Sequence, residues 1–278
     1  QSGSPPAMLA FLAATVAGLA FDPASAVRPA SSARTFAGLS VLSTPRWPLV
    51  DRVRRVARAS SFVYMGDGAS GVGELPELVV LDLDMCVWSP EMYLLSSDCT
   101  DPTTGDLNGR GEGVVGVRSG TDMIRLFPGA LAALQQCHDE LIPRGMRLAV
   151  ASSADTPRAV EIGKQAMSML EVLPGLTLYD VLRMGWEGDA DDNLQIGRSP
   201  PLSSDKSRTH FPILREKTNV EYEHMLFFDD SLWSDHCAIV ERNCPGVTTV
   251  RTPKGMTVEA WETGLRAYAR NAAARAQE

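Results

Sequence analysis

The sequence predicts an α/β fold built on a doubly wound parallel sheet. The first observation is a run of apolar residues, Leu78–Leu81, that passes directly into the carboxylates Asp82 and Asp84. The second is that two later apolar runs, 147–151 and 225–228, also end in pairs of polar residues. The third is that helical patterns separate these runs. Buried strands that alternate with helices are typical of parallel sheets.

Each expected element has a local cause. Apolar residues bounded by polar ones predict the strands, two short apolar runs around Ser119–Asp122 predict a hairpin, and Pro128 suits the first turn of a helix. We expect, in chain order, a strand at 78–83, a Gly-rich loop up to residue 113, a hairpin at 114–127, a helix at 128–142, a strand at 147–151, a helix at 157–169, a helix at 207–217, strands at 225–228 and 247–251, and a helix at 258–275. The acidic stretch 188–193 lacks the pattern of an EF-hand loop, so a solvated insertion is expected there rather than a calcium site.

Composition narrows the function. The 278 residues carry a formal net charge of −8, which argues against a nucleic-acid-binding protein because such proteins are usually basic. The five cysteines are odd in number and form no C-x-x-C pair, so neither a disulfide framework nor a zinc site is expected. His138 beside Cys137 and His236 beside Cys237 are interpreted as ordinary residues, since adjacent side chains do not easily reach one metal.

The first 62 residues form a separate segment in composition. They hold seven Arg, no Lys and two acidic residues, whereas the remainder is strongly acidic. Residues 8–21 are apolar but shorter than the about 20 residues of a membrane-spanning helix, and Ala24-Ser25-Ala26 resembles a signal-peptide cleavage site. The Arg- and Ser-rich stretch that follows is typical of transit peptides.

We therefore expect a targeting presequence at 1–62 and a folded domain at 63–278, with no stable membrane span in the mature protein. A signal peptide followed by a transit segment indicates a plastid of the algal type. The alternatives are a mitochondrial presequence or a disordered tail on a cytoplasmic protein.

Three polar clusters follow the three central strands: Asp82 with Asp84, Ser152 with Ser153, and Asp229 with Asp230. In open α/β sheets, ligands bind outside the carboxyl ends of the strands. Gathered carboxylates repel one another unless a cation lies among them, and oxygen ligands suit Mg²⁺. Lys206 adds an ammonium between the second and third clusters. Mg²⁺ and Lys206 could balance the charge of a phosphate while a serine hydroxyl donates to it.

These residues carry a resemblance to a known family. Asp82-Leu83-Asp84, Ser152, Lys206 and Asp229-Asp230 resemble, in this order, the four motifs of the haloacid dehalogenase (HAD) superfamily. More narrowly, LDLDMCVW, LAVASSADTPRAVEIGKQAM, KSRTHFPIL and MLFFDDSLW are similar to the magnesium-dependent phosphatase 1 family, over about residues 76–256. The resemblance implies a HAD-like Rossmannoid fold and a magnesium-dependent acid-type phosphatase, a phosphoric monoester hydrolase.

The resemblance also implies a role for each residue. Asp82 would be the nucleophile that forms an aspartyl-phosphate, and Asp84 the general acid and then the general base. Ser152 and Ser153 would bind the phosphoryl group, and Lys206 would orient Asp82 and stabilise the transition state. Mg²⁺ would be held by Asp82, the backbone carbonyl of Asp84, Asp229 and Asp230.

Three positions depart from the family pattern. Lys206 stands four residues before His210, where three are expected, so Arg208 is a rival for its role. Cys86 replaces a Thr or Val. Ser231–Ser234 replaces acidic and Arg-Asn positions, which leaves detailed specificity open.

Only about thirty-five residues, 92–127, separate the first motif from the helix at Pro128. We call this insertion the flap and expect a loop and hairpin rather than a large cap domain. An open site favours a phosphorylated small molecule or a phosphoprotein, including phosphotyrosine or a sugar phosphate, although the long loop at 185–205 would narrow access. We expect a monomer. The alternatives are a non-catalytic HAD-fold binding protein and, with less support, a dehalogenase or phosphomutase.

Overall fold

The computed structural model describes residues 73–154 and 156–277, and every structural statement below concerns those residues. The presequence predicted for residues 1–62 lies outside them. The strands are β1 Leu78–Leu81, β2 Trp88–Ser89, β3 Cys99–Asp106, β4 Glu112–Ser119, β5 Asp122–Leu126, β6 Arg147–Ser152, β7 Glu171–Leu173, β8 Leu176–Thr177, β9 Leu194–Ile196, β10 Met225–Asp229 and β11 Thr248–Arg251. The helices are α1 Pro128–Gln136, α2 Pro157–Met169, α3 Leu178–Arg183, α4 Ala190–Asn193, α5 His210–Thr218, α6 His236–Asn243 and α7 Val258–Arg275, with short turns η1 Met92–Leu94, η2 Cys137–Leu141, η3 Ile142–Arg144 and η4 Tyr222–His224.

The central sheet confirms the doubly wound α/β prediction. Its five strands lie in the order β11-β10-β1-β6-β9, and all neighbouring pairs are parallel. The chain moves from β1 outward through β6 to β9, then returns to the other side of β1 for β10 and β11. The direction of winding therefore reverses at β1, which is the place where open α/β sheets bind ligands.

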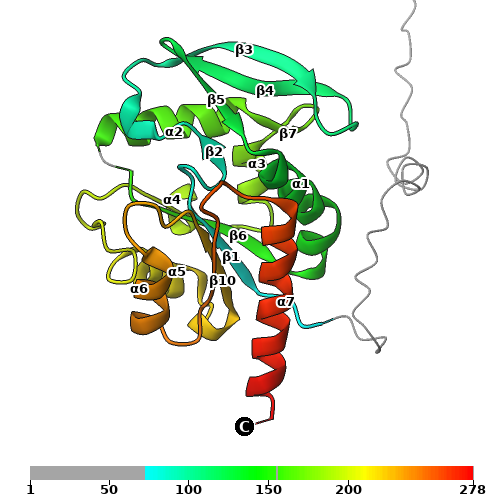
Figure 1. Ribbon diagram of the computed structural model, residues 1–278, viewed down its shortest axis with the longest axis vertical. Helices are drawn as coiled ribbons and strands as arrows, with labels where there is room; N and C mark the ends of the chain where they lie inside the picture. The colour runs from blue at the N-terminus through cyan, green and yellow to red at the C-terminus, as the bar shows by residue number, and fades with distance from the viewer. Residues whose placement is uncertain (1–72, 155, 278) are drawn as a thin grey trace, which may run out of the picture. The chain divides into compact units, whose positions relative to one another are not determined.

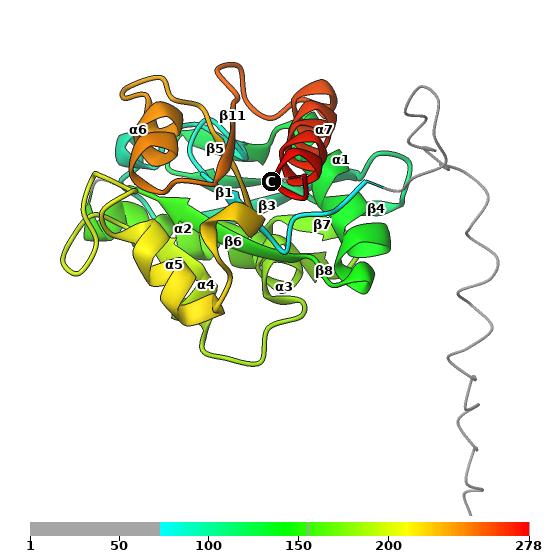
Figure 2. The ribbon, with the colours of Figure 1, turned by 90° about the horizontal axis from the view of Figure 1, so that it is seen from below.

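Alternate residues of the strands supply two apolar cores, one on each face of the sheet. Val79 and Leu81 of β1 belong to the core formed with α1, α2, α3 and α7, whereas Leu78 and Val80 belong to the core formed with α5 and α6. Figure 2 shows α1 and α7 on one side of the sheet and α5 and α6 on the other. Burial on both faces explains why β1 reads as an unbroken apolar run.

The flap forms a second, antiparallel sheet above the first (Figure 1). Its strand order is β2-β5-β4-β3, and β4 and β5 make the predicted hairpin with Ser119 opposite Asp122. The short strand β2 joins it just before the flap begins, with Trp88 opposite Leu126. No large cap domain is present in the described residues.

The turn between β3 and β4 is fastened to the body of the domain. The buried amide of Gln135, on α1, donates to the carbonyl oxygens of Leu107 (3.0 Å) and Val172 (2.9 Å) and accepts a hydrogen bond from Asn108 (3.2 Å). Arg110 pairs with Asp139 at 2.5 Å nearby. The distant end of the flap is therefore anchored to α1 and β7.

Several elements were predicted wrongly from the sequence. The acidic stretch 188–193 is exposed at Gly188 and Asp189 as expected, but it is not an insertion: it ends in α4 and leads into β9, the fifth strand of the central sheet. Asn193 is fully buried and donates to the carbonyl oxygens of Leu148 and Leu182. The expected loop before residue 113 contains the strand β3, and α5 begins at His210 rather than at residue 207.

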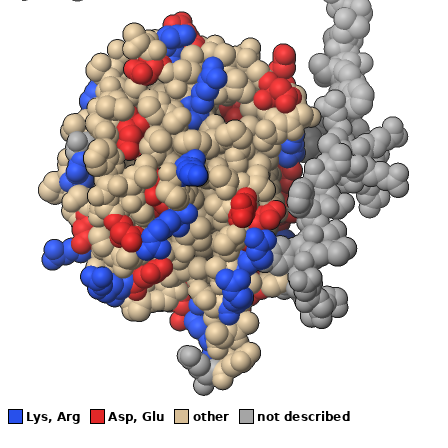
Figure 3. Space-filling view, in the orientation of Figure 1, with Lys and Arg blue, Asp and Glu red and all other residues tan. Residues whose placement is uncertain are grey.

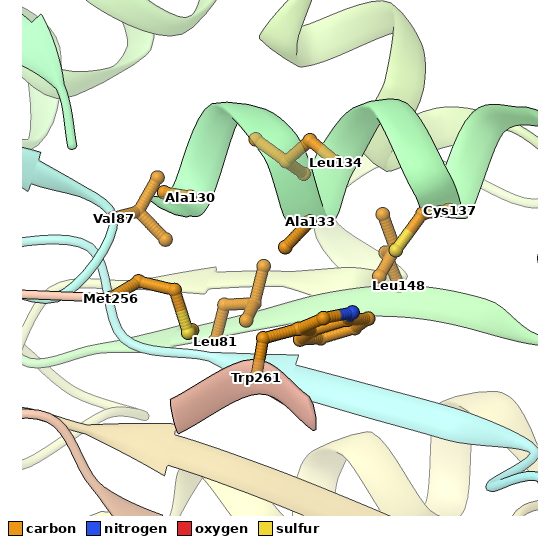
Figure 4. A pocket seen from close by; sticks show the side chains of 9 residues that line it. All are labelled: Leu81, Val87, Ala130, Ala133, Leu134, Cys137, Leu148, Met256 and Trp261. Atoms are coloured by element: carbon orange, nitrogen blue, oxygen red, sulfur yellow. The ribbon is translucent and has the colours of Figure 1, made fainter. Parts of the chain in front are cut away.

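The core between α1 and the sheet contains a small apolar cavity (Figure 4). It is lined by side chains of α1, β1, β6 and α7, among them Leu134, Leu81, Leu148 and Trp261. Because no charged side chain lines it, this cavity is a packing feature of the core rather than a site for polar chemistry.

On the face shown in Figure 3, acidic and basic side chains are interspersed rather than gathered by sign. Within 73–154 and 156–277, no helix combines the length and the apolar character needed to cross a bilayer.

Candidate active site

A polar pocket of about 590 Å³ opens at the carboxyl ends of the central strands. The pairing register places Asp82, the residue after β1, level with Asp229, the last residue of β10, and the N–H of Asp82 donates to the carbonyl of Phe228 at 2.9 Å. The lining includes Asp82, Asp84, Ser152, Ser153, Lys206 and Asp230. Six of the seven predicted site residues thus share one pocket, and the seventh, Asp229, is completely buried next to it.

Lys206 ties the first and third clusters together. Its ammonium lies 2.9 Å from Asp82 Oδ1 and 2.6 Å from Asp229 Oδ2, and all three side chains are buried. Burial alone would lower the pKa of Lys206, but the carboxylates of Asp229 and Asp82 raise it above its usual value. Although burial opposes ionisation, Lys206 holds the pKa of Asp229 below its usual value. Lys206 is therefore a permanent cation in the floor of the pocket.

The one-residue offset of Lys206 is absorbed by a turn before α5. The carbonyl of Lys206 accepts the N–H of Phe211, and that of Asp205 accepts the N–H of Arg208. Ser207 faces α6, where its hydroxyl accepts a hydrogen bond from Asn243 at 2.9 Å. Arg208 is exposed and does not line the pocket. Of the two rivals named from the sequence, only Lys206 reaches Asp82.

Three carboxylates form a cluster suited to a cation. One oxygen each from Asp82, Asp229 and Asp230 lies within 4.8 Å of the others. Burial raises the pKa of Asp82, against the effect of Lys206, and raises the pKa of Asp230 to about 6 with a further contribution from Asp229. The Oδ2 atom of Asp230 is buried without a hydrogen-bond partner in the described residues. Three close carboxylates, one ammonium and an unpartnered oxygen fit a hard divalent cation such as Mg²⁺.

Asp84 is held at both carboxylate oxygens. The indole Nε1 of Trp88 donates to Oδ1 at 2.8 Å, and the backbone N–H of Met92 donates to Oδ2 at 3.0 Å. Burial outweighs these two hydrogen bonds and raises the pKa of Asp84 to about 6. Its side chain is absent from the carboxylate cluster, so the sequence expectation that Asp84 contributes to a metal site concerns its backbone carbonyl alone.

Ser152 is the last residue of β6, Ser153 follows it, and both border the pocket. His210, from the KSRTHFPIL motif, lies behind them: its Nε2 is 3.1 Å from the carbonyl oxygen of Gly197 and 3.3 Å from that of Ser152. The hydroxyl of Thr209 is 3.1 Å from Nδ1. Burial lowers the pKa of His210 to about 4, so the ring is neutral and joins the ends of β6 and β9.

The rim of the pocket contains residues that sequence reasoning did not assign. Trp233 is 79% exposed, yet its Nε1 donates to Glu91 at 3.0 Å, and both residues line the pocket with Tyr93. The departure from the family pattern at Ser231–Ser234 was a signal that this rim differs from that of the family. Trp88 was also missed, because its contact with Asp84 depends on a tight turn after Leu83 that the sequence did not predict.

Cys86 lies below the pocket rather than in it. Its thiol is buried and accepts a hydrogen bond from the hydroxyl of Thr252 at 3.2 Å. Its backbone carbonyl accepts the N–H of Met256 at 2.8 Å. Cys86 therefore connects the loop after β1 to the loop after β11. The thiol makes this contact in place of the Thr or Val side chain of the family pattern.

Comparison with known proteins agrees with the geometry. The family model described as Acid Phosphatase matches residues 74–271. Magnesium-dependent phosphatase 1 of Homo sapiens is 27% identical over 199 residues, an alignment that covers 72% of this chain and 90% of the human protein. The match to the family model contains every residue of the pocket and none of the expected presequence.

Proposed function

The chain belongs to the acid phosphatase family of HAD-like enzymes, and on that premise we propose that it is a Mg²⁺-dependent phosphomonoester hydrolase that works through Asp82. The observation that carries the proposal is the contact between Lys206 and Asp82 at 2.9 Å in the floor of a pocket that also contains Asp84 and Ser152. A carboxylate nucleophile, a second carboxyl group, a fixed cation and a hydroxyl donor are the groups that phosphoryl transfer requires.

In the first half-reaction, an oxygen of Asp82 attacks phosphorus and the bond from phosphorus to the leaving oxygen breaks. That leaving oxygen takes the proton of Asp84, so the alcohol departs neutral. Lys206 balances the charge of the phosphoryl oxygens, and the hydroxyl of Ser152 donates a hydrogen bond to one of them. The product on the enzyme is the aspartyl-phosphate of Asp82.

In the second half-reaction, Asp84 takes a proton from water while the water oxygen attacks phosphorus. The bond between phosphorus and Asp82 breaks, and inorganic phosphate leaves. Asp82, the backbone carbonyl of Asp84, Asp229 and Asp230 would hold Mg²⁺. The bound ion would supply charge neutralisation for the phosphoryl oxygens and relieve the repulsion among the carboxylates.

The open mouth favours a leaving group of considerable size. Tyr93 and Trp233 present aromatic surface at the rim, with 43% and 79% of their surfaces exposed. Aromatic rings at a pocket rim suit planar or apolar groups, which favours phosphotyrosine over a sugar phosphate among the substrates that the family resemblance implies.

The test is Mg²⁺-dependent hydrolysis of p-nitrophenyl phosphate by the purified full chain. We expect activity that EDTA abolishes and added Mg²⁺ restores, and a loss of all but a few per cent in Asp82→Asn. An Asp82→Asn enzyme that keeps more would rule out this nucleophile. No hydrolysis of any phosphomonoester would favour the non-catalytic binding protein.

A phosphate-release screen identifies the substrate class. Sugar phosphates, nucleotides and phosphotyrosine peptides are compared at equal concentration, with and without EDTA. The highest kcat/KM is expected for the phosphotyrosine peptides. A higher value for sugar phosphates would contradict the assignment of the rim.

A further inference from the structure

Trp88 makes an unusual contact for a core residue. Its indole N–H points at Asp84 Oδ1 from 2.8 Å, and the contact arises from one tight turn. The carbonyl of Leu83 accepts the N–H groups of residues 86, 87 and 88, at 3.2, 2.8 and 3.1 Å. Such a turn brings residues four apart to the same side, which directs the indole onto the carboxyl group.

The indole itself is fixed on several sides. Trp88 is fully buried, its backbone belongs to β2 opposite Leu126 of the flap sheet, and its ring faces α2. A Cβ atom added at Gly163 of α2 would lie 3.7 Å from Cζ2 of the ring. The indole N–H therefore cannot turn to follow a moving carboxyl group, and Asp84 is held by a rigid donor.

We infer that Trp88 is a positioning residue for the proposed general acid: it holds the carboxyl group of Asp84 so that its proton meets the leaving oxygen. Each carboxyl oxygen has two acceptor positions, and the donors from Trp88 and Met92 take one on each. The remaining positions are available for the proton that moves to the leaving oxygen as the bond to phosphorus breaks. The inference rests on the proposed function.

If Trp88 positions Asp84, the loss of kcat/KM in a Trp88 variant should depend on the leaving group of the substrate. A poor leaving group, such as the alkoxide of benzyl phosphate, needs the proton of Asp84 in the transition state. A good leaving group, such as p-nitrophenolate, departs with little protonation. Because kcat/KM reports the steps up to the first irreversible one, it measures this difference even if hydrolysis of the aspartyl-phosphate limits kcat.

The experiment compares Trp88→Phe with the wild type on these two substrates. Trp88→Phe should lower kcat/KM for benzyl phosphate about 10-fold and for p-nitrophenyl phosphate less than about 3-fold. Trp261→Phe is the matched control: Trp261 is equally buried and its N–H donates to Gln136 at 2.8 Å, but it does not line the pocket. Trp261→Phe should leave the ratio of kcat/KM for benzyl phosphate to kcat/KM for p-nitrophenyl phosphate unchanged.

A double-mutant cycle with Asp84→Asn separates positioning from a structural role. If Trp88 acts through Asp84, Trp88→Phe should change kcat/KM by less than about 2-fold in the Asp84→Asn background. Equal losses on both substrates, or additive losses in the cycle, would overturn the inference. Failure of the proposed function is distinguishable, because then Asp82→Asn would also retain activity.

Thermal unfolding of each variant serves as the control that the variant is folded. Should Trp88→Phe not fold, benzothienylalanine incorporated at position 88 replaces the indole N–H by sulfur and keeps the volume of the ring. The same loss on benzyl phosphate is expected from that replacement. An unchanged ratio of the two kcat/KM values would refute the positioning role.

Discussion

The ammonium of Lys206 lies 2.9 Å from Asp82 although Lys206 precedes α5 by four residues and comes from the loop that follows β9. The contact joins a residue at the end of β1 to one that lies 124 positions later in the chain. Lys206 also reaches Asp229, so a single side chain neutralises charge from two strands of the sheet.

Lys206→Ala should lower kcat by about 10²-fold or more, because it removes the fixed cation next to the proposed nucleophile, Asp82. Arg208→Ala is the matched control, since Arg208 is exposed on the same turn and should be replaceable with little effect. Steady-state rates with p-nitrophenyl phosphate measure both. A near-wild-type rate for Lys206→Ala with a collapsed rate for Arg208→Ala would assign the role to Arg208.

Asp230→Asn should weaken the affinity for Mg²⁺ at least about 10-fold, because it removes one of three clustered carboxylates. The affinity is measured from the rise in unfolding temperature during a Mg²⁺ titration, which does not depend on activity. Glu91→Gln removes a carboxylate that lines the pocket outside the cluster, and it should shift the affinity less than about 3-fold. Equal shifts in the two variants would place the cation elsewhere.

His210 should make the protein less stable as the pH falls. Its pKa in the folded state is about 4 instead of 6.5, so between these values the unfolded chain binds the proton more readily. The stability that depends on the neutral ring is complete above pH 6.5 and is lost as the pH falls toward 4, by at most about 3 kcal/mol.

Urea unfolding at pH 7 and pH 5 measures this loss. His210→Gln should be less stable than the wild type at pH 7, because the links to Ser152 and Gly197 are weakened, but it should lose less stability between the two pH values. Identical losses in both proteins would show that His210 does not carry the effect.

Trp233→Ala should raise KM for aromatic phosphomonoesters about 3- to 10-fold and change kcat little, because in the proposed function the ring would contact the leaving group and not the phosphoryl group. Sugar phosphates should be less affected. Val258→Ala is the control, since Val258 is an exposed apolar residue that does not line the pocket. An unchanged KM would exclude Trp233 from substrate binding.

Removal of residues 1–62 should leave a folded and active enzyme, because every described strand and every residue of the pocket lies beyond residue 72. Circular dichroism and hydrolysis of p-nitrophenyl phosphate would be compared with those of the full chain. Loss of folding would mean that the segment is structural and not a targeting sequence.

The sequence predicted the parts of the fold that have a strong local cause. The strands β1, β6 and β10 are buried on both faces, so their apolar runs and polar ends could be recognised. β9 was missed because it has three residues, one of them Gln195, after an acidic stretch. β3 was missed because CTDPTTGD is polar and contains Pro and Gly, which is tolerated on an edge strand.

The site residues that could be predicted are also those with a local cause in the sequence. Residues at strand ends come together in any parallel sheet, so Asp82, Ser152 and Asp229 could be grouped from their positions alone. The choice between Lys206 and Arg208 could not be made, because it depends on how the turn before α5 is wound. The contact of Trp233 with Glu91 spans 142 positions and has no local pattern.

The anchored flap has a consequence for how the enzyme selects among substrates. Gln135 and the pair Arg110–Asp139 fasten the turn between β3 and β4 to the domain body, so the flap, whose residue Tyr93 lines the pocket, is already in place before a substrate arrives. Substrate binding energy is therefore not used to close the flap. Discrimination would then come from static shape and contacts rather than from induced fit, and competing substrates would be ranked by the fit of their leaving groups to a preformed rim.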